Sequence, residues 1–366
     1  AGDPVQITTH YAHGFELNPA FNNDVDMQQI LMDTDFGTPN VVAVPHRYLA
    51  LDLVGRGIEF IVDEGLSCFD FVPYKFGGDY TPNGEPEPVV PSGNPVLRGV
   101  ILDDNMLSMA PNLSAWGLQN ASHISIKCNV ITKLVATIGN STIPFFDETT
   151  SVFINVSLDG NQIAELPTSL LDNIFSNAYI GVSLCNNLIT YVPTGVLSGR
   201  FSLARVSIIL NSNSIETLPS NFFNTQSDLV FMYLDVVQLS FDSNRISKFP
   251  TNFFSQQNYN IGTVQVSLRS NELMELPTAM FNGSQVFNKI IMMLNDNSIE
   301  TLPAELFNTT RNVEAISLSL TNNKVSILPL GLFTPILFVN KVVLFLNDNS
   351  IVEAGSVFWR WSTFSS

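Results

Sequence analysis

The residue types that could bind a metal or transfer protons are few and scattered. The chain has 366 residues, of which 4 are His and 3 are Cys. His10 and His13 offer two imidazoles without a third ligand, which is a weak indication of a metal site. A nearby acidic cluster lacks the glycine and the final Glu of an EF-hand loop, so it is interpreted as a solvated loop rather than a Ca²⁺ site. That cluster comprises Asp24, Asp26, Asp33 and Asp35.

Motifs that would indicate catalysis are missing from the sequence. It contains no G-x-S-x-G, no phosphate-binding Gly-rich loop, no H-E-x-x-H and no dinucleotide fingerprint. We therefore expect neither an enzyme nor a bound cofactor or metal.

The composition excludes further classes of function. Asp and Glu number 33 against 16 Lys and Arg, giving a formal net charge of −17, and nucleic-acid binding needs clustered basic residues. No stretch approaches the roughly 18 uncharged apolar residues of a spanning helix, so direct membrane insertion is not expected. Hydrophobic residues make up 45% and charged residues 13%, which predicts a large buried core rather than disorder.

The elements that must position any functional residue come from an internal repeat that begins near residue 100. Leu210–Pro219 and Leu294–Pro303 are its clearest copies, and weaker ones are centred on Asn105 and Asn129. Most steps between the marker asparagines are 26 residues, as from Asn161 to Asn187. These asparagines are Asn161, Asn187, Asn213, Asn244, Asn271, Asn297, Asn323 and Asn349.

Each copy predicts a short strand followed by a turn. Alternating apolar residues such as Val206, Ile208 and Leu210 indicate a half-buried strand, and the Asn amide that follows can satisfy backbone groups as the chain turns. Pro then ends the ladder. A large apolar residue four positions after the Pro is expected to stack between repeats as a spine. In the later repeats this residue is Phe223, Phe254, Phe281, Phe307 and Phe333.

These residues resemble the leucine-rich-repeat family, in its extracellular form LxxNxIxxLPxxxF, from Val100 to about Trp359. The resemblance implies an α/β-type repeat solenoid: a horseshoe with a parallel β-sheet on the concave face and a mostly irregular or 3₁₀ convex side. Two features depart from the family. The period is 26 rather than the common 24, and the cysteine-rich caps of many secreted members are missing.

The predicted organisation has four parts. Residues 1–72 form an N-terminal cap or small β-rich domain, 73–99 a Pro/Gly-rich linker, 100–359 a solenoid of about ten repeats with the first two degenerate, and 360–366 an aromatic tail. The sequence starts at Ala1 without Met, which is typical of a secreted protein after signal removal, although a trimmed sequence would look the same.

Outward strand positions and the C-terminus are the predicted interaction surfaces. Most outward residues are small and uncharged, but two apolar pairs are expected to lie on either side of Ser317 and Ser319 as one exposed patch. The aromatic residues of the tail either fold over the end of the solenoid or are covered by another chain. The candidate interface residues are Ile291, Met293, Val343, Phe345, Trp359, Trp361 and Phe364.

The cysteines and the glycosylation sequons are relevant to whether the protein is extracellular. Cys128 and Cys185 fall two repeats apart, beyond disulfide reach, whereas Cys68 with Cys128 is conceivable and Cys185 is expected to be free or intermolecular. Six N-x-[ST] sequons are possible glycosylation sites, although this many are expected by chance in so Asn-rich a chain. They are Asn112, Asn120, Asn140, Asn155, Asn282 and Asn308.

Two functional hypotheses remain. The first is an extracellular, secreted or cell-surface structural or adhesive subunit that assembles with itself, as a head-to-tail filament or another homo-oligomer. The alternative is a recognition module, a receptor ectodomain or secreted binder, that holds a protein or glycan ligand on the concave face. The uncapped aromatic end and the scarcity of charge favour the first.

Overall fold

The structure is a computed structural model in which the chain divides into two compact units. The first comprises residues 1–163 and 173–187, the second residues 164–172 and 188–366, and each is described by itself. The residues described are 6–13, 45–56, 58, 97–110, 121, 123–134, 136–138, 141–143, 153–168, 170, 179–194, 196, 205–220, 222, 232–251, 253–254, 259–278, 280–281, 286–307, 313–330, 332–333 and 339–354.

The first unit is built on a sheet whose repeat strands are parallel. Its order is β1 (Gln6–His13), β2 (Pro45–Asp52), β3 (Leu97–Ile101), β4 (His123–Ser125), β7 (Phe153–Ser157) and β8 (Tyr179–Ser183). β1 pairs antiparallel with β2, and every later pair is parallel. A short antiparallel hairpin, β5 (Ala136–Ile138) and β6 (Ser141–Ile143), interrupts the repeats.

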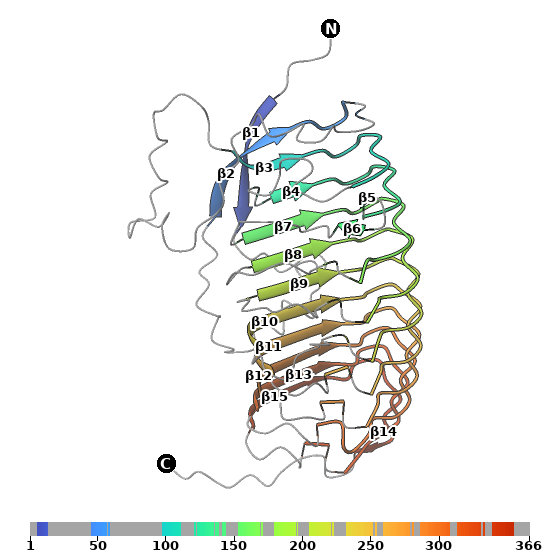
Figure 1. Ribbon diagram of the computed structural model, residues 1–366. Helices are drawn as coiled ribbons and strands as arrows, with labels where there is room; N and C mark the ends of the chain where they lie inside the picture. The colour runs from blue at the N-terminus through green and yellow to red at the C-terminus, as the bar shows by residue number, and fades with distance from the viewer. Residues whose placement is uncertain are drawn as a thin grey trace, which may run out of the picture. The chain divides into compact units, whose positions relative to one another are not determined.

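The second unit has the same design, and apart from its first strand its repeat strands are longer than those of the first unit (Figure 1). Its parallel order is β9 (Arg205–Ile209), β10 (Met232–Ser240), β11 (Tyr259–Ser267), β12 (Val286–Met293), β13 (Val313–Ser319) and β15 (Val339–Phe345). A second ladder on the turn side pairs β14 (Ile327–Leu328) with β16 (Glu353–Ala354), also in parallel. The predicted repeat solenoid, with one parallel strand per repeat and an irregular opposite side, is confirmed. In the part of the chain that the structure describes, no helix is long and apolar enough to cross a membrane.

The core lies between the strands and the turns that follow them. Alternate strand residues point into it, as Val206, Ile208 and Leu210 do at 1% exposure or less. The phenylalanines four residues after the prolines stack from repeat to repeat, which buries the aromatic surface of each against its neighbours. Successive ring centroids of Phe254, Phe281, Phe307 and Phe333 lie 5.2, 5.6 and 5.4 Å apart. Phe223 lies outside the described residues.

A second core column, one residue before this spine, was not expected from the sequence. Phe222 and Phe253 are fully buried, with ring centroids 4.9 Å apart. Met280, Leu306 and Leu332 continue the column, each fully buried. The two columns together account for the consecutive apolar pairs that follow each Pro, such as Leu306 with Phe307.

The repeat geometry also extends N-terminal to Val100. The Leu53 and Gly55 N–H groups donate to the carbonyls of Ile101 and Asp103, as the equivalent residues of later repeats do. Gly55 has a φ of 64°, like the residue before each marker Asn. Arg56 occupies the marker position itself, so a search for Asn could not find this copy.

Candidate functional site

The marker asparagines form a ladder of buried or half-buried amides through each unit. Asn297 is typical: its Oδ1 accepts a hydrogen bond from the Leu273 N–H at 3.0 Å. Its Nδ2 donates toward the Leu268 carbonyl of the preceding repeat at 2.8 Å and the Leu294 carbonyl of its own at 3.0 Å. One side chain thus satisfies backbone groups of two successive repeats, which would otherwise be buried without partners.

This is a leucine-rich-repeat fold. The same bonds recur at the other marker positions, so the ladder and not the strand alone defines the repeat. The equivalent N–H···Oδ1 bonds lie between 2.9 and 3.2 Å at Asn129, Asn161, Asn187, Asn213, Asn244, Asn271, Asn323 and Asn349.

The residue before each ladder Asn adopts the left-handed conformation. Its φ lies between 52° and 69° in every leucine-rich repeat from Asp104 to Asp348. Residues with short polar side chains, and Gly, tolerate this region best. At most of these positions the residue is Asp, Asn, Ser or Gly, and we attribute this choice to the backbone conformation rather than to ligand binding. Cys128, with a φ of 52°, is the one residue of another type among them.

A second polar row runs along the outer face of the sheet, which is the face that points away from the repeat core. In the first unit, Asp159 Oδ1 accepts from the Ser183 hydroxyl and the Cys185 N–H of the next repeat, both at 2.7 Å. Asp103 accepts from the Ser125 hydroxyl at 2.8 Å in the same way. These carboxylates are occupied in joining neighbouring repeats, which argues against a role as general bases.

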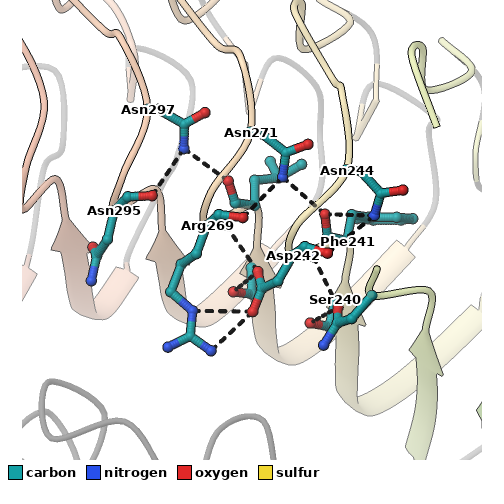
Figure 2. Close-up of polar contacts among 11 residues, drawn as sticks. Ser240, Phe241, Asp242, Asn244, Arg269, Asn271, Asn295 and Asn297 are labelled. Atoms are coloured by element: carbon teal, nitrogen blue, oxygen red, sulfur yellow. Dashed lines mark hydrogen bonds and ion pairs between the residues drawn. The ribbon is translucent and has the colours of Figure 1, made fainter. Parts of the chain in front are cut away.

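In the second unit the same row is buried at Asn211, Ser240 and Asp242, and it includes an ion pair (Figure 2). Asn211 Oδ1 accepts from the Ser240 hydroxyl at 2.7 Å and the Asp242 N–H at 2.8 Å. Asp242 in turn binds the guanidinium of Arg269 through Nε at 3.0 Å and Nη2 at 2.9 Å. Burial raises the pKa of Asp242 to about 6, against hydrogen bonds from Ser267 and the Arg269 N–H that lower it. Burial also lowers the pKa of Arg269.

The raised pKa of Asp242 predicts a pH-dependent stability. Because the folded protein holds the proton more tightly than the unfolded chain, whose pKa is near 3.8, this group favours folding most at low pH. The free energy of unfolding should fall by roughly 2 to 3 kcal/mol as pH rises from about 4 to about 6, and then level off. Urea unfolding across this pH range gives the free energy of unfolding of the wild type and of Asp242→Asn. The difference between the two values at each pH isolates the contribution of Asp242. A difference of opposite sign would mean that the ion pair with Arg269 outweighs the cost of burial.

The structure corrects the prediction of an exposed apolar patch on the outer face. The strand register does place Ile291 beside Ser317 and Met293 beside Ser319. However, Ile291 is 4% exposed, and Met293 is 1% exposed. Ser317 and Ser319 are fully buried, so this part of the outer face is covered within the chain. Strand alternation gives the direction of a side chain but not what packs over it, which is why the sequence could not predict this burial.

The last strand of the second unit is different. Val342 and Leu344 are paired in register with Ile316 and Leu318 and point to the same side of the sheet. Ile316 and Leu318 are fully buried, whereas Val342 and Leu344 are only half-buried.

The outer-face side chains of β15 are equally incompletely covered. Val343 and Phe345, two of the predicted interface residues, are half-buried. Among the described strands β15 pairs only with β13, so no described strand lies along its far edge, which is called the open edge below. β15 therefore offers incompletely buried apolar side chains on both faces together with this open edge.

Several other predicted site residues lie outside what is described. They comprise the acidic cluster, Cys68, the three aromatic residues of the tail and every sequon except Asn155, which is exposed on β7. His10 and His13 fall on β1. Among the described residues no group of three or more His, Cys, Asp or Glu could hold a metal ion.

The two described cysteines, Cys128 and Cys185, are thiols and do not form disulfides. Cys128 is exposed, and its pKa is raised by partial burial and by the nearby carboxylates of Asp104 and Asp103. A raised thiol pKa disfavours the nucleophilic thiolate at neutral pH. Cys185 is half-buried on the outer face, with its sulfur 3.5 Å from the Ser183 hydroxyl. The surroundings of Cys128 therefore do not activate it as a nucleophile.

Comparison with known proteins finds similar folds at low sequence identity. No family model matches the chain, and no curated protein matches it. TLR13 in complex with ssRNA13 is 15% identical with a TM-score of 0.33, over 82% of this chain and 50% of TLR13. Drosophila Toll in complex with Spätzle is 18% identical with a TM-score of 0.36, over 69% of this chain and 36% of that chain.

A bacterial structure matches over more of its own length. The leucine-rich-repeat protein from Leptospira interrogans is 15% identical with a TM-score of 0.32, and 83% of each chain is covered. The chain thus spans half of TLR13 and about a third of the Toll chain. No functional conclusion follows from likenesses at this level.

Proposed function

We propose that the protein is a non-catalytic extracellular interaction module that associates with itself through β15, the last strand of its second unit. The observation that carries the proposal is the incomplete burial of Val342 and Leu344, whose partners in β13 are fully buried. A repeat in the middle of a solenoid buries such side chains against the next repeat. A second copy of the chain covering this end would bury them in the same way.

The half-buried outer-face residues of β15 provide the test. Replacing Val343 and Phe345 together by Asp should leave the monomer folded, because neither side chain points into the repeat core. Two carboxylates at this end should abolish self-association. Sedimentation velocity over a range of concentrations measures the mass of both proteins, and circular dichroism checks the fold.

The matched control removes an exposed apolar side chain elsewhere. Met106, in the first unit, is 55% exposed, so Met106→Asp should associate as the wild type does. Unchanged association of the Val343→Asp, Phe345→Asp variant would contradict the role of β15. A wild-type protein that stays monomeric at every concentration would contradict self-association altogether.

A second candidate is recognition of a polar ligand by the outer face of the first unit. This face is accessible, since Asn155 is exposed and Ser157 and Ser183 are half-buried, unlike the buried serines of β10–β13. Such a face suits a protein or glycan ligand. Asn155 is also a sequon, and a glycan on it would obstruct that face. Glycopeptide mass spectrometry of the secreted protein decides whether the face is free.

A further inference from the structure

We infer that self-association through β15 is symmetric: the β15 strands of two copies pair antiparallel, edge to edge, across a two-fold axis. This inference rests on the self-association proposed above and specifies its geometry and its limit. An interface in which the same surface meets itself closes after two copies, so the product is a dimer rather than a filament.

The first support is the direction of the backbone groups of β15. The Leu320 N–H donates to the Phe345 carbonyl at 2.8 Å, so the backbone groups of Phe345 point toward β13. Alternate residues of a strand direct these groups to opposite sides. The N–H and C=O of Val342 and Leu344 therefore point to the open edge. A strand with its own row of donors and acceptors can pair there without rearrangement.

The second support is that the two-fold axis matches each face with itself. An axis perpendicular to the sheet keeps the core side of one copy beside the core side of the other. Val342 and Leu344 of the two copies then extend a single core, while Val343 and Phe345 meet on the outer side. Both half-buried faces of β15 are thus covered by one partner, and cross-strand apolar pairs of this kind stabilise a sheet.

The charge of Lys341 limits the registers in which the two β15 strands can pair. Lys341 is the charged residue of β15. A pairing centred on Lys341 would place two ammonium groups directly opposite each other, which is destabilising. A pairing centred on Val342 places Lys341 opposite Val343, and one centred on Val343 places it opposite Phe345. In both registers the N–H groups at the open edge of one strand also face the C=O groups at the open edge of the other, so that hydrogen bonds can form between the strands.

The N-terminal edge is a poorer partner for β15, which disfavours the head-to-tail arrangement expected from the sequence. β1 runs antiparallel to the repeat strands, so a head-to-tail contact with β15 would not continue the solenoid as a further parallel repeat. Its sequence, QITTHYAH, is also largely polar, whereas β15 reads VNKVVLF. The strand that best matches the apolar composition of β15 is β15 of another copy.

The test blocks the open edge without removing an apolar side chain. Asn340 is exposed, and its N–H points to the open edge by the same alternation. Asn340→Pro removes that donor and sets a ring against the incoming strand, which should weaken dimerisation at least tenfold. Asn340→Thr keeps the N–H and should dimerise as the wild type does. Sedimentation equilibrium measures the dissociation constants, and amide hydrogen exchange follows Val342 and Leu344.

We expect a wild-type dimer of about twice 40.3 kDa, with the Val342 and Leu344 amides exchanging at least tenfold more slowly at high protein concentration. Rings or filaments, or equal dissociation constants for the Pro and Thr variants, would overturn the symmetric β15 pairing but leave self-association standing. A wild-type monomer at all concentrations would overturn the proposed self-association and this inference with it.

Discussion

Replacing Asn297 by alanine is expected to lower the free energy of unfolding by about 2 to 6 kcal/mol. The loss should be large because the Asn297 amide serves backbone groups that have no access to water. Without it, the Leu273 N–H and the Leu268 carbonyl are left buried and unbonded. Each such orphaned group costs roughly 1 to 3 kcal/mol.

Chemical denaturation of purified Asn297→Ala measures this loss. Asn347 gives a matched control, since it is exposed and stands outside the ladder, two residues before Asn349. Asn347→Ala should stay within about 0.5 kcal/mol of the wild type. If both variants were equally stable, the ladder amides would be replaceable by water, and the repeat would be held together by its apolar core alone.

Replacing Phe307 by alanine should destabilise the second unit by roughly 3 to 5 kcal/mol. Phe307 is fully buried, and its ring stacks on Phe281 at 5.6 Å and on Phe333 at 5.4 Å. Truncation removes both stacking contacts and opens a cavity that the rigid neighbouring rings cannot fill.

Thermal and urea unfolding of Phe307→Ala provide the measurement, with Phe333→Ala for comparison. Phe333 is in the same column but half-buried at the last stacked position, so its loss should cost distinctly less. An equal cost at both positions would show that exposure does not govern the energetics of this spine. A negligible cost at Phe307 would mean that the column does not hold the repeats together.

The repeat itself was predictable because its chemistry is local. A ladder Asn such as Asn297 is the residue that must bond two repeats at once, and no other side chain offers an acceptor and two donors in so small a volume. Its spacing therefore appears directly in the sequence. The strand before it follows from alternation, and the structure has one parallel strand for each marker from Asn161 onward.

The parts that could not be predicted depend on what lies over a surface. Ile291 and Val343 look alike in the sequence, as alternate apolar residues on the outer face, yet Ile291 is 4% exposed and Val343 is half-buried. The difference goes with position along the solenoid, since β12 lies between β11 and β13 whereas β15 pairs with β13 alone among the described strands, and a local pattern does not encode that position. The early repeat at Arg56 was missed for another reason, because its marker is not Asn although its backbone follows the others.

The two-repeat reach of each ladder amide has a consequence for how the gene can change in length. Inserting one residue between Leu294 and Asn297 would displace the amide from the groups it bonds on both sides. Duplicating or deleting the whole 26-residue interval between Asn271 and Asn297 would instead return every amide to an equivalent pair of neighbours. The protein can therefore lengthen or shorten in whole repeats, and selection should remove length changes inside the segment from the strand to the ladder Asn. Elsewhere in the repeat the length can vary, since Asn213 and Asn244 are 31 residues apart and Asn244 still makes its ladder bond at 3.0 Å.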